Sequence, residues 1–124
     1  MGSSEDLLVR CVTACMQCPL TCTACSDACL AEDDLVDLVG CIRTSLGCAV
    51  MCDATAKILT RQTEADVMVA GAALSACLAA IVACAEECER HAAHHKHCEI
   101  SASVCRDAEM ACRNLLAVLD PPGL

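Results

Sequence analysis

One stretch near the N-terminus constrains the fold of this chain more than any other. Six cysteines follow one another at separations of four, three, four, three and four residues: Cys11, Cys15, Cys18, Cys22, Cys25 and Cys29. Core positions of a helix in a bundle recur in this alternation, about every 3.5 residues. The spacing therefore predicts an α-helix whose buried face consists of thiols, where most bundles have leucine.

Three later segments repeat the same rhythm. The second has core positions Leu38, Cys41, Ser45, Cys48, Cys52, Thr55 and Leu59; the third has Leu74, Cys77, Ile81, Cys84 and Cys88; the fourth has Cys98, Ser101, Cys105, Ala108 and Cys112. We expect helices over about 4–31, 35–59, 67–90 and 95–119, with Ser3 or Ser4 capping the first and residues 120–123 ending the fourth.

Four helices of similar length joined by short turns favour an all-α fold, an up-down-up-down antiparallel four-helix bundle with a cysteine-lined core. Residues 1–124 form a single domain on this interpretation. The first and third turns lie at one end of such a bundle. Cys29, Glu32 and the histidines of residues 91–97 are therefore expected to share that end.

The cysteines are predicted to be reduced. Fifteen in 124 residues is a level typical of disulfide scaffolds. However, the count is odd, the N-terminal residues do not resemble a signal peptide, and the spacing is helical, whereas disulfide frameworks are mostly loop-rich. These features favour a cytoplasmic protein with free thiols. The small side chains Cys and Ala fill the core, so we expect the bundle to fold without metal.

Charge and hydropathy exclude two classes of partner. The net charge of −9 argues against nucleic acid, which selects basic surfaces. Residues 67–85 carry no charge and are long enough to cross a bilayer, but acidic residues flank them and no Lys or Arg cluster marks a cytoplasmic side. We interpret this segment as a buried helix covered by a subunit interface, with no membrane as partner.

The thiol spacing favours Cu(I) among the soft metals that thiolates select. Residues at i and i+4 of a helix lie about 5–6 Å apart between Cβ atoms, so their sulfurs can share one two-coordinate ion, which Cu(I) accepts. Five pairs have this spacing: Cys11/Cys15, Cys18/Cys22, Cys25/Cys29, Cys48/Cys52 and Cys84/Cys88. We expect intrahelical sites, formed by two thiols of the same helix, to be dense on the first helix.

Five cysteines lack an i+4 partner: Cys41, Cys77, Cys98, Cys105 and Cys112. The last three are seven residues apart on the fourth helix and must find partners on other helices, so we expect interhelical sites near that helix. One Cu(I) per thiolate would leave the buried core neutral, so many ions per chain are tolerable. Zinc buffering and iron–sulfur binding remain the alternatives, although Zn²⁺ requires four ligands and iron–sulfur motifs usually lie in loops.

The histidines are candidate ligands at the mouth of the core. His91 continues the third rhythm three residues after Cys88, and His94 and His95 precede Cys98 by four and three residues. We rank His91 first, followed by His95 and His94, and expect His97 to face solvent. The chain contains no Ser-His-Asp set, no Gly-rich phosphate motif and no inward Glu-x-x-His pair. We therefore expect a protein that is not an enzyme.

The assembled motifs resemble those of the cytosolic copper storage proteins, four-helix bundles lined with cysteine. The resemblance rests on the Cys11–Cys29 run, on C-I-R-x4-C-x3-C from Cys41 to Cys52, and on C-x-E-E-C-E-R-H from Cys84 to His91 followed by H-x-H-C ending at Cys98. It implies storage of several Cu(I) ions per chain, assembly as a homotetramer, and passage of copper through one end. The chain departs from the pattern at Ile81, Ser101 and Ala108, where we expect many relatives to carry cysteine.

Overall fold

Four long helices make up the computed structural model, which describes residues 3–119. They are α1 (Ser4–Leu30), α2 (Val39–Thr60), α3 (Val67–His91) and α4 (Lys96–Leu119), with a short 3₁₀ segment, η1 (Leu35–Leu38), before α2. No strand occurs in this part of the chain, so the all-α prediction is confirmed. The predicted helix stop at residues 120–123 lies outside the described residues.

The helices begin where local side chains satisfy free backbone donors. Ser3 and Asp6 form a capping box: the Ser3 hydroxyl accepts from the Asp6 amide and the Asp6 carboxylate accepts from the Ser3 amide, both at 3.2 Å. Asp66 caps α3 by accepting from the amides of Met68 and Val69. The second α-helix begins at Val39, later than the predicted start at Leu35, because residues 35–38 form the tighter 3₁₀ turn.

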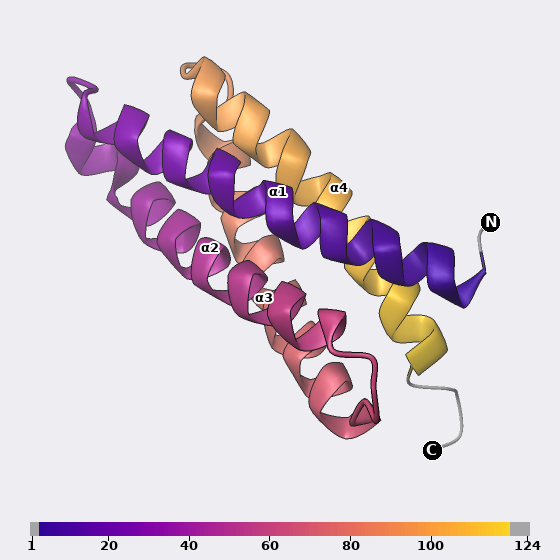
Figure 1. Cartoon of the computed structure of the whole chain (residues 1–124). Helices are drawn as coiled ribbons and strands as arrows, with labels where there is room; N and C mark the ends of the chain where they lie inside the picture. Colours follow the sequence, from indigo (N-terminus) through magenta and orange to yellow (C-terminus); the bar gives the residue numbers. More distant parts are fainter. Residues whose placement is uncertain (1–2, 120–124) are drawn as a thin grey trace.

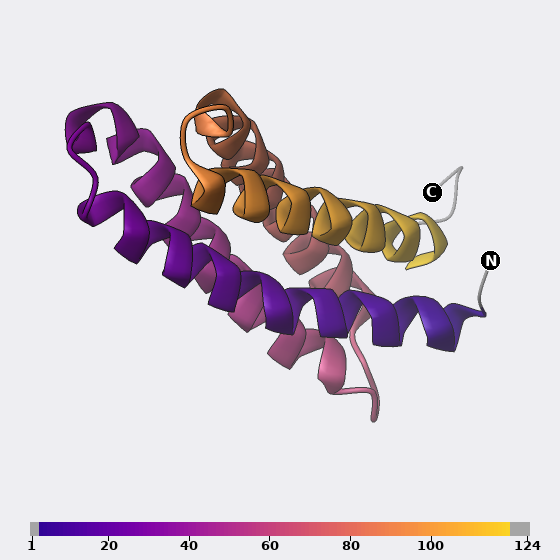
Figure 2. The same ribbon diagram turned by 90° about the horizontal axis from the view of Figure 1, so that it is seen from above.

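The helices form a closed ring in which α1 packs on α2 and α4, and α3 packs on the same two neighbours. Figure 1 shows that the α1–α2 and α3–α4 connections lie at one end, and the α2–α3 connection lies at the other. Figure 2 shows the same arrangement from above, with α1 and α4 side by side. The predicted up-down-up-down topology is confirmed, and it brings the acidic first turn beside the histidines.

The core changes character along the bundle axis. Leu59 and Leu115 are buried at the end of the α2–α3 connection, where they line a hollow together with Leu8 and Ala70. Leu74 is fully buried one turn further along α3. The middle of the bundle and the histidine end are filled mainly by cysteine. Three buried leucines therefore lie at one end of the thiol core, whereas the histidine end has one, Leu38, beside its cysteines.

Three segments are long and apolar enough to cross a membrane by length and composition: Ser4–Leu30, Leu35–Thr60 and Val67–His91. In the first two, much of the apolar character comes from cysteines that face the core, and charged residues such as Arg10, Arg43 and Lys57 are exposed. The outer face of α3 differs. Met68 is 83% exposed there, and residues 67–85 carry no charge.

Candidate metal centre

All fifteen cysteines are free thiols, and each is at most 2% exposed. Their sulfurs gather into clusters that follow the bundle axis. The outer cluster, next to the histidine end, contains Cys25, Cys29, Cys41 and Cys98. Their sulfurs lie within 4.8 Å of one another, with Cys41 3.9 Å from both Cys25 and Cys98. Cys88 joins this cluster through a 3.5 Å contact with Cys41.

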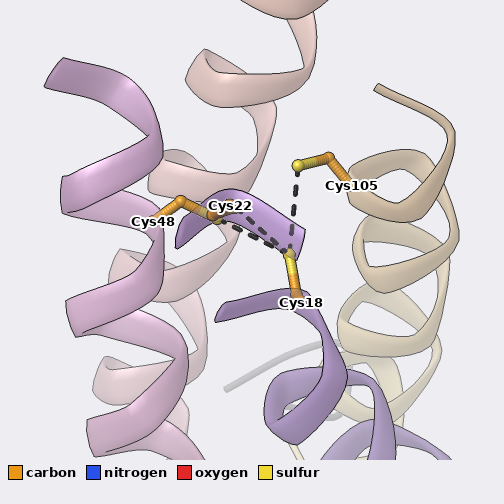
Figure 3. Close-up of side chains that lie close together, drawn as sticks. All are labelled: Cys18, Cys22, Cys48 and Cys105. Carbon is orange, nitrogen blue, oxygen red and sulfur yellow. Dashed lines mark hydrogen bonds between the residues drawn. The ribbon is translucent and has the colours of Figure 1, made fainter. Parts of the chain in front are cut away.

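The middle cluster contains Cys18, Cys22, Cys48 and Cys105, which come from α1, α2 and α4. Figure 3 shows their side chains converging between the helices. The sulfur of Cys18 is at the centre, 3.9 Å from Cys22, 3.8 Å from Cys48 and 3.9 Å from Cys105. This geometry offers four thiols to one ion or to several bridged ions.

The inner cluster lies toward the three buried leucines. It consists of two sets of three that share Cys15: one with Cys11 and Cys112, the other with Cys52 and Cys77. Cys112 is 3.7 Å from Cys11 and 4.0 Å from Cys15, and Cys77 is 3.8 Å from Cys52. A shared thiol of this kind is suited to bridge two neighbouring ions.

The five predicted i, i+4 pairs do place their sulfurs close together. Three pairs are in direct contact, Cys18/Cys22 and Cys48/Cys52 at 3.9 Å and Cys84/Cys88 at 4.0 Å. The Cys11/Cys15 and Cys25/Cys29 pairs share a cluster. Every cluster also draws thiols from other helices, so the thiols of α1 lie within reach of thiols from α2, α3 or α4.

The five cysteines without an i+4 partner all find neighbours on other helices, which was expected for the three on α4. Cys98 and Cys41 contact each other, Cys105 contacts Cys18, Cys112 contacts Cys11, and Cys77 contacts Cys52. These contacts depend on the rotation and axial stagger of the helices, which sequence spacing within one helix does not specify.

His97 is the histidine that reaches the thiols. Its Nδ1 lies 3.5 Å from the Cys25 sulfur, 3.6 Å from Cys98 and 3.9 Å from Cys29, and its side chain is 23% exposed. The expectation that His97 faces solvent is wrong. The sequence does indicate that His97 faces the core, because His97 lies four residues before the core residue Ser101 and so on the same face of α4.

The other histidines line the mouth without touching a thiol. His95 is held between two carboxylates: it pairs with Glu32, and its Nε2 lies 2.9 Å from Asp34. The hydrogen bond with Asp34 raises the pKa of His95, and the same bond lowers the pKa of the Asp34 carboxyl. Glu32 also lies 3.6 Å from His97 Nε2, so Glu32, His95 and His97 form a three-donor group.

His91 and His94 are further from the core. His91 Nε2 lies 3.6 Å from a Glu87 carboxylate oxygen on the same helix. His94 is exposed, and its side chain forms no hydrogen bond with any residue in the 3–119 range. Of the three histidines predicted from the sequence, the structure brings only His95 into a group of metal-binding donors.

Four core positions carry no thiol between the clusters. Ser45 and Ser101 are fully buried, and so are Ile81 and Ala108, to within 1%. The Ser45 hydroxyl lies 3.6 Å from the Cys84 sulfur. The Ser101 hydroxyl has no hydrogen-bond partner among the described residues. Along the bundle axis, levels of the core that carry thiols therefore alternate with levels at which these four residues stand.

Burial favours the protonated form of these thiols. It raises the pKa of Cys29 to about 11 and that of Cys98 to about 12, because the charged thiolate would lose its hydration. Within the middle cluster, a hydrogen bond from Cys105 lowers the pKa of Cys18, while the thiol contact with Cys105 raises that of Cys48. A thiolate there depends on neighbours that stay protonated, so the clusters need cations to ionise fully.

The fold and the clusters define a class, a helical-bundle protein with a metal-binding thiol core. Residues 4–117 match the family described as copper storage protein, Csp. The chain belongs to this family.

Relatives of known sequence or structure match this chain over nearly its full length. The uncharacterized cysteine-rich protein YhjQ of Bacillus subtilis (strain 168) is 35% identical over 113 residues, which cover 91% of this chain and 99% of the relative. A cytosolic copper storage protein from Streptomyces lividans with five coppers is 46% identical, with a TM-score of 0.90 over 92% of this chain and 95% of that one. The same Streptomyces lividans protein, Ccsp, loaded with 10 copper equivalents is 47% identical, with a TM-score of 0.89 over 90% and 85%.

The raised thiol pKa values predict that the metal-free protein loses stability in alkaline solution. Unfolded thiols ionise near pH 8.5. Above that pH Cys29 and Cys98 hold their protons in the folded state and lose them in the unfolded state, so these two thiols lower the free energy of unfolding as pH rises. This stabilisation is complete below about pH 8.5 and is lost toward the folded values of about 11 for Cys29 and about 12 for Cys98.

Urea unfolding of the reduced, metal-free protein, followed by circular dichroism, measures this effect. The midpoint should fall by on the order of 1 M urea between about pH 7.5 and about pH 9.5. The double variant Cys29→Ser/Cys98→Ser should show a smaller fall. A wild-type midpoint that stays constant or rises over this interval would contradict the assignment of raised thiol pKa values.

Proposed function

We propose that this chain stores Cu(I) by binding many ions in the thiol core. The observation that carries the proposal is the burial of all fifteen thiols in contacting clusters. A thiol can serve as a small core hydrophobe in one protein, but fifteen in register on four helices require a common cause. Soft thiolates select soft metals, and Cu(I) accepts two or three sulfur ligands.

Charge favours Cu(I) over Zn²⁺ in this core. A cluster with one Cu(I) per thiolate is neutral, whereas Zn²⁺ held by four thiolates leaves two negative charges buried. No Lys or Arg side chain is buried among the described residues, so no protein cation offsets such a charge. The two four-thiol sets nevertheless fit a tetrahedral ion, which makes zinc buffering the second candidate. Iron–sulfur binding gains no support from these geometries.

The relatives support the storage proposal. The Streptomyces lividans protein is described as a cytosolic copper storage protein, and its structures contain five coppers or were loaded with 10 copper equivalents. We place this chain in the cytoplasm as well, on the strength of that likeness and of its free thiols. Its role in this proposal is sequestration without catalysis, with copper ions as its cargo and neither nucleic acid nor a membrane as partner.

Anaerobic titration of the reduced protein with Cu(I), against a chromogenic chelator, tests storage. We expect on the order of ten tightly bound ions per chain or more, approaching one per thiol. About one proton should be released per ion, because the thiols are protonated before loading. Binding of only one or two ions would end the proposal. Retention of Zn²⁺ in the presence of stoichiometric Cu(I) would favour zinc buffering.

Copper passes through the histidine end in this proposal. Leucines lie buried at the opposite end, and His97 contacts three sulfurs of the outer cluster. Glu32 and His95 complete a donor group at the mouth that could receive an ion before the thiols do. His91 and His94, which the sequence also suggested, lie further from the sulfurs.

Removing the imidazole at position 97 should slow the uptake of copper without removing a thiol. We expect His97→Ala to reduce the initial rate of Cu(I) transfer from a chelator by about 3- to 10-fold, with capacity nearly unchanged. The matched control is His94→Ala, which removes an exposed imidazole from the same turn. Equal rates in the two variants would show that His97 does not receive the incoming ion.

We also propose that the chain assembles as a homotetramer through the outer face of α3. Val67, Met68 and Val69 are exposed there on a helix that stays uncharged to residue 85. A water-facing helix normally carries a polar outer face, so an apolar one favours burial against another subunit. The family resemblance supports the same assembly.

Light scattering coupled to gel filtration should report four times the chain mass of 12.9 kDa. Met68→Glu would bury a charge in the proposed interface and should shift the protein to smaller species. Val36→Glu provides the control, because Val36 is equally exposed but lies in η1 at the histidine end. A wild-type mass of a single chain would exclude the assembly.

A further inference from the structure

Two serines interrupt the thiol column between the outer and middle clusters. Ser45 lies four residues after Cys41 and three before Cys48 on α2. Ser101 lies three residues after Cys98 and four before Cys105 on α4. Both hydroxyls are buried in the core. Hydroxyl oxygen is a hard donor and a poor ligand for Cu(I), so neither α2 nor α4 offers a sulfur at this level.

One thiol spans the interruption. On α3, the Cys84 sulfur lies 4.0 Å from Cys88, which contacts the outer cluster, and 4.0 Å from Cys22, which belongs to the middle cluster. The hydrogen-bonding contacts between thiols in the described residues therefore connect the two clusters by the route Cys41, Cys88, Cys84 and Cys22. The Ser45 hydroxyl lies 3.6 Å from the Cys84 sulfur on this route.

The remaining thiols divide into two pools on either side of Cys84. The outer pool is Cys25, Cys29, Cys41, Cys88 and Cys98. The inner pool is Cys11, Cys15, Cys18, Cys22, Cys48, Cys52, Cys77, Cys105 and Cys112. Contacts of 4.0 Å or less are frequent within each pool, whereas Cys84 makes the contacts between them.

We infer that Cys84 is the relay through which Cu(I) moves between the outer and inner pools. This inference rests on the proposed storage function and adds a transport route to it. It assigns Cys84 a role that Cys77, the α3 thiol of the inner pool, does not share. The outer pool should fill and exchange quickly, and the inner pool should fill more slowly and hold its copper longer.

The transfer balances without any redox change. The copper stays Cu(I): a Cu–S bond forms to the Cys84 sulfur, and a Cu–S bond to Cys88 breaks. The receiving thiol releases its proton, and the vacated thiolate takes one up, so the core remains neutral. The next step repeats this exchange from Cys84 to Cys22, again over a 4.0 Å sulfur separation. Short steps between contacting sulfurs avoid a bare ion in an apolar core.

Stopped-flow loading of the reduced, full-length protein tests the relay. The protein is mixed anaerobically with an excess of a coloured Cu(I)–chelator complex, and loss of colour follows uptake. Cys84→Ser should leave the fast phase unchanged and slow the later phase by about tenfold or more. Cys77→Ser is the matched variant, since it removes one buried thiol from the same helix but lies within the inner pool. It should lower capacity similarly and slow the later phase less than twofold, by about the loss of one acceptor.

A second variant tests the route itself. Ser101→Cys places a sulfur on the α4 face between Cys98 and Cys105, so Cys84→Ser/Ser101→Cys should recover the rate of the later phase. Circular dichroism verifies folding, and Cys84→Ala replaces Cys84→Ser if the serine variant does not fold. The relay is overturned if Cys84→Ser loads as fast as Cys77→Ser, since copper would then pass along α1 from Cys25 to Cys22. A wild-type capacity of one or two ions would instead refute storage, and the relay with it.

Discussion

The structure depends on one property of the thiol group, which is that it can serve both as core and as ligand. A protonated thiol is a small, nearly apolar side chain that packs well inside a protein. The same sulfur, once deprotonated, is a strong ligand for soft metals. The chain contains no Phe, Tyr or Trp, so cysteine, together with a few leucines and alanines, has to build the core. Because protons and Cu(I) carry the same charge, exchanging one for the other leaves this core neutral.

The two ends of the bundle differ because the core composition differs. Leu59, Leu74 and Leu115 offer no donor to an ion, and their side chains are buried at the end of the α2–α3 connection. At the opposite end, Glu32 and Asp34 follow α1, and His95 and His97 stand at the start of α4. Only the antiparallel topology brings these residues, more than sixty positions apart, into contact. The two ends of the bundle therefore differ in what they offer to an ion: leucine side chains at one end, and imidazole and carboxylate groups at the other.

Helical periodicity predicted most of this fold and almost none of its cross-helix geometry. Spacing of three and four residues identified the buried positions of all four helices, since a helix face is a local property. It could not pair Cys18 with Cys105, because that contact depends on how α1 and α4 are rotated and staggered. The prediction for His97 failed for a different reason: its spacing from Cys98 does not indicate burial, whereas its spacing from Ser101 places it on the buried face of α4. The 3₁₀ turn at residues 35–38 has no side-chain cap that would signal it.

Ser101 shows that stability alone does not account for the interruptions in the thiol column. Its hydroxyl is fully buried without a partner among residues 3–119, a situation that typically costs about 1–3 kcal/mol. A cysteine at this position would have nearly the same size and a much weaker need for a hydrogen bond. The folded, metal-free protein would therefore be expected to be more stable with sulfur there. Ser101 thus costs stability and removes a ligand at one level of the core. Its effect on copper explains it better, because it separates the outer pool of thiols from the inner pool.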